Sequence, residues 1–233
     1  MAAYPEIDFA GRALVNLQDR DVDITIPIER FSVSGRVRIE NPPAGFDLSK
    51  HEVILRGDPS FRAKARIAAD GSFTFEAVPA SGYELVLSDD ALQNTYIKSA
   101  AMGREDVLSS SVQITGRQTD SLEILLSGNG GELSGTVFNE QQQPVAESIV
   151  GLVPNAAGAT RRLDLYKTAT TDRSGKFEIR GTAPGEYSVF SWPEVDPGAW
   201  LDPKFLNAYR NFGASFRIRE GQTLSANVLC IQY

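Results

Sequence analysis

Cysteine and histidine are nearly missing from this chain: its 233 residues include one cysteine, Cys230, and one histidine, His51. A single cysteine excludes an internal disulfide and a metal cluster built on cysteines. Zinc sites and nucleophile–base pairs draw on the same two residue types and therefore have little support. The sequence also lacks a Gly-x-Ser-x-Gly elbow, a His-Glu-x-x-His motif and a phosphate-binding loop. We therefore expect no catalytic residues, no metal site and no cofactor.

Positive charge and long apolar runs are scarce as well. The chain has 23 Lys and Arg against 30 Asp and Glu, a net charge of −7. Binding to a phosphate backbone needs clustered Lys and Arg, so we expect no nucleic-acid partner. The longest apolar run, Ile149–Val153, has the length of a strand and falls far short of the ~20 residues of a membrane span. The first residues also lack the basic start and apolar segment of a signal peptide.

Acidic residues gather at Asp19, Asp21 and Asp23, the one place where their spacing invites a metal interpretation. No glycine turn or bidentate Glu follows them, so a solvated acidic edge is the preferred interpretation. Asp70 and Asp172 each stand shortly before a glycine. This pattern predicts hairpin turns, because Asp caps its own turn and Gly supplies a positive φ.

Two stretches of the chain carry the same motif. Phe73 and Phe177 are 104 positions apart, and so are Tyr83 and Tyr187. The stretches themselves are Asp70-Gly71-Ser72-Phe73-Thr74-Phe75 and Asp172-Arg173-Ser174-Gly175-Lys176-Phe177. Self-similarity at a fixed period indicates a tandem array, so the function is that of a repeated module.

Each copy is predicted to be a set of short strands. Apolar and polar residues alternate along Phe31–Ile39 and Leu122–Leu126, a pattern typical of strands with one buried face. The alternation slips by one residue between Ile28 and Phe31 and again after Ser127, so no flat strand continues through either point. We predict an all-β chain with β-sandwich modules at residues 30–128 and 129–233. Residues 1–29 are expected to be the closing strand or tail of a preceding repeat.

Four residues shared by the two copies are expected to be structural. Gly35 and Gly135 stand inside the first strand of each copy, where a glycine allows a bulge or a close backbone approach. Tyr83 and Tyr187 stand just after a turn, where sandwiches often place a tyrosine corner with a buried ring and a hydroxyl bonded to backbone.

An aromatic excursion after Tyr187–Ser191 is the best candidate interaction surface. It contains both tryptophans, Trp192 and Trp200, together with Phe205, Tyr209 and Phe212. Asp202, Pro203 and Gly213 have the types and spacing of helix caps, which predicts a short helix near 203–212. Exposed aromatics stack on sugars or anchor protein interfaces, so the candidate binding residues are Trp192, Trp200, Tyr209 and Phe212. The favoured interpretation is nevertheless that these residues form a lid over the open end of the sandwich.

The motifs resemble the carboxypeptidase regulatory-like family, a transthyretin-like sandwich found in tandem in bacterial surface proteins. The second copy carries the pattern nearly whole: Ser134-Gly135-Thr136-Val137, Pro144-Val145, Thr171-Asp172, Gly175, Phe177 and Pro184-Gly185-Glu186-Tyr187. The first copy departs from it at Asn41-Pro42-Pro43 and at the longer turn Pro79–Tyr83. The resemblance implies two tandem seven-stranded-type Greek-key sandwiches (transthyretin/prealbumin-like). The fold is grouped with starch-binding-like sandwiches, which adds carbohydrate binding as an expectation from analogy.

We therefore expect a non-enzymatic structural or binding array, a spacer or adhesion segment of a larger surface or exported bacterial protein. Its expected location is extracellular, periplasmic or at the cell surface, and its expected partner is a polysaccharide or another protein. Two alternatives stay open. One is a carbohydrate-binding module that acts through Trp192 or Trp200, and the other is an accessory domain of a peptidase or hydrolase, which the full-length gene would reveal.

Overall fold

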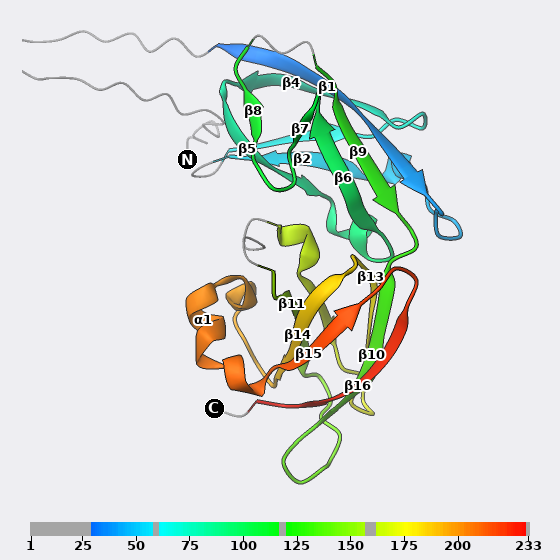
Figure 1. Ribbon diagram of the computed structural model, residues 1–233, viewed down its shortest axis with the longest axis vertical. Helices are drawn as coiled ribbons and strands as arrows, with labels where there is room; N and C mark the ends of the chain where they lie inside the picture. The colour runs from blue at the N-terminus through cyan, green and yellow to red at the C-terminus, as the bar shows by residue number, and fades with distance from the viewer. Residues whose placement is uncertain (1–28, 58–60, 117–119, 157–161, 232–233) are drawn as a thin grey trace, which may run out of the picture.

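The computed structural model describes residues 29–57, 61–116, 120–156 and 162–231. Strands dominate these ranges, and their sheets pack face to face, so the prediction of an all-β chain with a β-sandwich fold is confirmed. The closing strand predicted within residues 1–29 lies outside the described residues, apart from Glu29. Figure 1 shows two bodies of strands stacked along the long axis of the molecule. They meet at residues 128–130, between the ninth and tenth strands.

The N-terminal half, residues 30–127, forms two sheets. The first has the order β4-β1-β9-β6-β7 and the second has the order β3-β2-β5-β8. Their elements are β1 (Arg30–Glu40), η1 (Leu48–Lys50), β2 (Glu52–Arg56), β3 (Arg62–Arg66), β4 (Ser72–Pro79), β5 (Ser81–Leu87), η2 (Asp89–Leu92), β6 (Tyr96–Met102), β7 (Glu105–Asp106), β8 (Val112–Ile114) and β9 (Leu122–Ser127).

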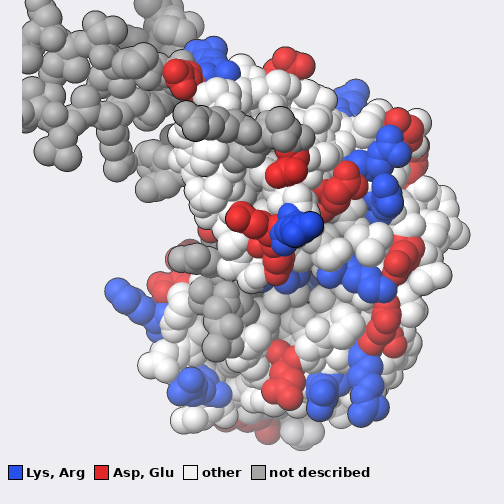
Figure 2. Space-filling view, turned by 45° about the horizontal axis from the view of Figure 1, so that its top comes forward, with Lys and Arg blue, Asp and Glu red and all other residues white. Residues whose placement is uncertain are grey.

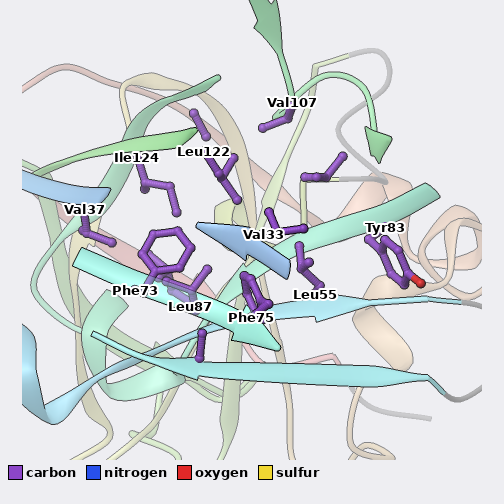
Figure 3. Close-up of a cluster of buried hydrophobic side chains, with 14 of the residues drawn as sticks. Val33, Val37, Leu55, Phe73, Phe75, Tyr83, Leu87, Val107, Leu122 and Ile124 are labelled. Carbon is purple, nitrogen blue, oxygen red and sulfur yellow. The ribbon is translucent and has the colours of Figure 1, made fainter. Parts of the chain in front are cut away.

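Side chains from both sheets fill the space between them. Figure 3 shows Val33 and Phe75 facing Leu55 across this core, with Tyr83 at one end of it. Phe73 and Phe75 meet edge to face, with their ring centroids 5.7 Å apart. The buried positions in β1 and β4 alternate with exposed ones, as a sheet with one solvated face requires.

The C-terminal half, residues 131–231, repeats this plan with a three-stranded sheet, β13-β10-β16, and a four-stranded sheet, β12-β11-β14-β15. Its strands are β10 (Gly131–Phe138), β11 (Ile149–Pro154), β12 (Lys167–Thr170), β13 (Lys176–Thr182), β14 (Gly185–Trp192), β15 (Ala214–Ile218) and β16 (Thr223–Leu229). Its short helices are η4 (Leu163–Leu165), η5 (Ala199–Leu201), α1 (Pro203–Ala208) and η6 (Arg210–Phe212). That each half folds as an independent domain stays a prediction.

The two halves share strand order and differ by one insertion. In both, the first strand pairs antiparallel with the fourth and parallel with the last, as in β1 with β4 and β9, and in β10 with β13 and β16. The N-terminal half adds β6 and β7 beyond β9, so seven strands were too few for it. Alternation could not reveal β6, because its register shifts between Ile97 and Ser99 and neighbouring residues are buried in pairs.

The predicted helix begins at Pro203, where Asp202 caps it by accepting a hydrogen bond from the Lys204 backbone N–H at 2.8 Å. It ends at Ala208, earlier than predicted, and the one-turn helix η6 follows. The insertion that contains α1 follows β14, just as the insertion that contains β6 follows β5. The same place in the plan therefore holds helix in one half and strand in the other.

Candidate functional site

The two glycines predicted to be structural lie where neighbouring strands approach closely. A Cβ at Gly35 would lie 2.4 Å from the Leu122 carbonyl oxygen, and a Cβ at Gly135 would lie 1.8 Å from the Ala226 carbonyl oxygen. Neither space accepts a side chain without moving the parallel strand beside it. The glycine therefore sets the distance between the first and last strands of each half.

Tyr83 and Tyr187 occupy corresponding corners of the two halves. Each ring is buried, and each hydroxyl donates to the carbonyl four residues earlier: Tyr83 to Pro79 at 2.8 Å and Tyr187 to Ala183 at 2.9 Å. Burial raises the pKa of both hydroxyls, so they remain protonated donors at neutral pH. This is the geometry of a tyrosine corner, and it ties the turn to the strand that follows.

Trp192, the first candidate binding residue, is fully buried. Its ring stacks on Phe190 at 5.6 Å and contacts Phe205 and Tyr209 at centroid distances of 5.7 and 6.0 Å. Its indole Nε1 has no hydrogen-bond partner among the described residues. A sugar cannot reach a ring packed on all sides, so the expectation that Trp192 itself binds a carbohydrate is corrected.

The aromatic excursion covers a sheet face and not the open end of the sandwich, which corrects the predicted lid. Val150 and Leu152 of β11 point into the core, whereas Val153 of the same strand belongs to the second apolar cluster with Trp192 and Phe205. The four-stranded sheet is therefore apolar on both faces. This explains why β11 is an unbroken apolar run, as expected for a doubly covered strand.

Three of the candidate residues keep contact with solvent. Phe212 is 53% exposed, while Trp200 and Tyr209 are partly buried against the aromatic cluster. All three come from the segment that holds η5, α1 and η6. This aromatic surface (Trp200, Tyr209 and Phe212) is what remains of the predicted binding site.

Sequence reasoning missed the junction between the halves, which Lys167 dominates. Its ammonium group donates to the backbone carbonyl of Leu92 and, at 3.4 Å, to that of Thr95, both in the N-terminal half. Burial lowers the pKa of Lys167 to about 8. The sequence around Lys167 looks like an ordinary strand with an exposed lysine, so only the three-dimensional arrangement identifies its role.

Backbone contact and two side-chain pairs complete this junction. Gly181 adopts a φ of +62°, and a Cβ there would lie 2.4 Å from the Thr95 nitrogen, so the two halves touch backbone to backbone. The Tyr96 hydroxyl donates to the Glu220 carboxylate at 3.0 Å, and Lys98 bridges Glu40 at 2.6 Å and Glu220 at 4.0 Å. These contacts join the N-terminal half, before residue 128, to the C-terminal half, after residue 130.

A shallow crevice opens beside the junction. Glu84, Leu85, Val107, Leu108, Ser110 and Ser111 line it from the N-terminal half, and Arg162 and Asp164 line it from the other. Arg162 and Asp164 already pair with each other through two hydrogen bonds of 2.8 and 2.7 Å. The space open to water is about 20 Å³, room for one or two water molecules. A crevice of this size does not enclose a substrate.

On the face that Figure 2 shows, the described residues form no large surface of a single charge. Figure 2 shows acidic and basic side chains interspersed on one face of the molecule. No three His, Cys, Asp or Glu residues within the described ranges lie close enough together to hold a metal ion. Cys230 and His51 are both buried, in different halves. No helix in the described part of the chain is long and apolar enough to cross a membrane.

Comparisons with known proteins find only distant structural likeness. No protein-family model matches the chain, and no curated protein matches it. The resemblance to the carboxypeptidase regulatory-like family therefore stays a prediction. Similar solved structures include the minor pilin of Streptococcus agalactiae, at 14% identity over 85% of this chain and 94% of the pilin, with a TM-score of 0.34.

Two further matches are equally distant. The putative carbohydrate-binding protein of Pseudomonas aeruginosa shares 14% identity over 43% of this chain and 88% of its own, with a TM-score of 0.30. The Bacillus anthracis TIE protein shares 14% identity over 87% of this chain, with a TM-score of 0.30, and this chain spans 34% of its length. Similarity at this level carries no argument about function.

Proposed function

We propose that this chain is a non-enzymatic tandem β-sandwich segment that acts as a rigid spacer in a larger protein. The observation that carries the proposal is the junction centred on Lys167. A flexible linker between modules shows few contacts across it, whereas here a half-buried ammonium group binds two carbonyls of the opposite half. The proposal also places the larger protein at the cell surface or outside the cell, which rests on the motif resemblance.

The hydrogen bonds at the junction favour a structural role for these residues over a catalytic one. Lys167 and the Arg162–Asp164 pair are each engaged by hydrogen bonds inside the protein. A catalytic group needs access to a substrate, and the crevice beside these residues leaves about 20 Å³ of space for water-sized probes. The Lys167 ammonium group therefore serves the junction between the halves.

Small-angle X-ray scattering on the chain and on Lys167→Ala tests the proposal. We expect the wild type to scatter as one particle of fixed shape, and the variant to show a broader distribution of maximum dimension. Lys176→Ala removes an exposed lysine from β13 and is the matched control, which should scatter like the wild type. Equal rigidity in all three proteins would remove the assigned role of Lys167, and a flexible wild type would overturn the spacer proposal.

A second candidate function is recognition of a polysaccharide or a protein through the aromatic surface. The observation that favours it is Phe212, a large apolar side chain that is 53% exposed. Exposed aromatics of this kind stack on sugars or anchor interfaces. A glycan array followed by titration of tryptophan fluorescence would test it. We expect Phe212→Ala and Trp200→Ala to lose binding together, and binding that survives both changes would exclude this surface.

A further inference from the structure

Strand β16 ends the three-stranded sheet of the C-terminal half. It pairs with β10 on one side, and no described strand lies on its other side. Figure 1 shows β16, in red, along the rim of the lower body. The backbone donors and acceptors on this open side form an edge that another strand can extend.

The matching edge in the N-terminal half is covered. There β9 corresponds to β16, and β6 pairs antiparallel with it from Tyr96 opposite Ser127 to Met102 opposite Leu122. The shared plan therefore accepts an antiparallel strand at this position. In the C-terminal half the corresponding insertion packs on the other sheet and leaves β16 open.

The sequence of β16 lacks the usual protection of an edge strand. Thr223–Leu229 contains no charged residue and no proline, and its register along β10 runs without a bulge. Leu229 is 43% exposed at its end. Two other edge strands carry charges: β13 has Lys176, Glu178 and Arg180, and β3 has Arg62, Lys64 and Arg66. Charges at edges disfavour pairing between molecules. Edge strand β8 (Val112–Ile114) also lacks charge but has only three residues, so β16 is the longer permissive edge.

Hydrogen bonds to β10 show which backbone groups of β16 face outward. The Gln222 carbonyl accepts from Glu132, the Ala226 carbonyl lies against Gly135, and the Cys230 N–H donates to Phe138. The N–H and C=O of one strand residue point to the same side, and successive residues alternate. The backbone groups of Ser225 and Asn227 therefore point to the open edge.

We propose that β16 pairs antiparallel with β16 of a second copy of this chain, around a twofold axis at Ala226. Ser225 of one copy then lies opposite Asn227 of the other, and each such pair exchanges two backbone hydrogen bonds. The inward positions of the two strands stay on the same face, which keeps both cores intact. A strand without charges meets itself without like-charge repulsion, and this favours a second copy as the occupant. The two three-stranded sheets become one continuous sheet.

Sedimentation equilibrium over a range of concentrations tests this pairing. We expect a monomer–dimer equilibrium for the wild type. Ser225→Lys with Asn227→Lys places lysines opposite one another and should weaken the dimer about tenfold or more. Ser215→Lys is the matched control, because Ser215 is an exposed residue on β15, the edge strand of the other sheet. It should dimerise like the wild type. A monomeric wild type, or a lysine variant that dimerises as well as the control, would overturn the proposal.

A second pair of substitutions with the opposite charge distinguishes a loss of dimerisation from a failure to fold. The double lysine variant mixed with Ser225→Glu/Asn227→Glu should form a heterodimer, because opposite charges then face each other across the strands. If both chains fold, as judged by circular dichroism, and the mixture stays monomeric, the proposed register is wrong.

Amide hydrogen exchange locates the contact. The amides of Ser225 and Asn227 should become protected as protein concentration rises and the dimer forms. Protection that does not depend on concentration would place a strand of the same chain on this edge and contradict the proposal. Dimerisation without protection of these two amides would also contradict the proposal.

Discussion

At the residue scale, two tyrosines, two glycines and one lysine fix how the strands and the two halves pack together. Tyr83 and Tyr187 close corresponding corners, and Gly35 and Gly135 allow corresponding strands to approach. These four roles were predicted from sequence because the residues recur in equivalent places, and a repeated glycine or tyrosine points to a backbone requirement. Lys167 could not be found in this way, since its partners are main-chain carbonyls 72 and 75 residues away.

Removal of one corner hydroxyl tests the role of the tyrosines. Tyr187→Phe deletes a donor and leaves the Ala183 carbonyl without it, so we expect the free energy of unfolding to fall by about 1–2 kcal/mol. Urea denaturation followed by fluorescence measures this loss. Tyr166→Phe, which removes another half-buried hydroxyl from the same half, should cost less than about 0.5 kcal/mol. Equal losses in the two variants would argue against a special corner.

The low pKa of Lys167 predicts a dependence of stability on pH. Burial lowers this pKa to about 8 in the folded protein, against about 10.4 for an unfolded lysine. Between these values the unfolded state binds more protons, so the contribution of Lys167 to the free energy of unfolding becomes more favourable as pH rises. Relative to Lys167→Met, the wild type should gain about 1–3 kcal/mol between pH 7 and pH 10.

Comparison with Lys167→Met isolates this effect, because other titrating groups contribute equally to both proteins. Urea denaturation at each pH, monitored by tryptophan fluorescence, supplies the two stabilities. A difference between the proteins that stays constant from pH 7 to pH 10 would show that Lys167 has an ordinary pKa and is not held at a buried junction.

Element-scale features divide into those that alternation predicts and those that it hides. β1 and β9 were predicted from Phe31–Ile39 and Leu122–Leu126, because each buries one face only. α1 was predicted from its caps, Asp202 and Pro203. β6 was missed because a register shift breaks its alternation. The aromatic segment was expected over the open end of the sandwich and instead covers a sheet face. A sequence shows which segment is aromatic but not which surface of the fold it covers.

Trp192 packs the aromatic excursion against the outer face of the four-stranded sheet, and its substitution tests that packing. Trp192→Ala removes a fully buried ring from the aromatic cluster and should cost about 3–5 kcal/mol. Trp192→Phe keeps most of the packing and removes an indole N–H that has no partner among the described residues. The second change should therefore cost much less, within about 1.5 kcal/mol. Chemical denaturation followed by circular dichroism measures both, and two equal losses would contradict this packing.

At the scale of the whole molecule, one plan is used twice and the two copies differ in how they treat their exposed faces. The N-terminal half extends a sheet with β6 and β7, and the C-terminal half covers a sheet with helices. That the repeated motifs mark a tandem array of modules stays a prediction, although the two halves share the pairing of their first strands. The motifs could not predict the junction, because Lys167, Gly181 and Glu220 meet Leu92, Thr95 and Tyr96 only once the halves are placed.

A rigid spacer requires that these two halves behave as one body. Backbone nitrogen-15 relaxation, measured at a concentration where the protein is monomeric, tests it most directly. If the halves form one rigid body, the described amides of both halves share a single rotational correlation time, appropriate to the full chain. Two shorter and different correlation times would show that the halves tumble independently, and would contradict a junction fixed by Lys167.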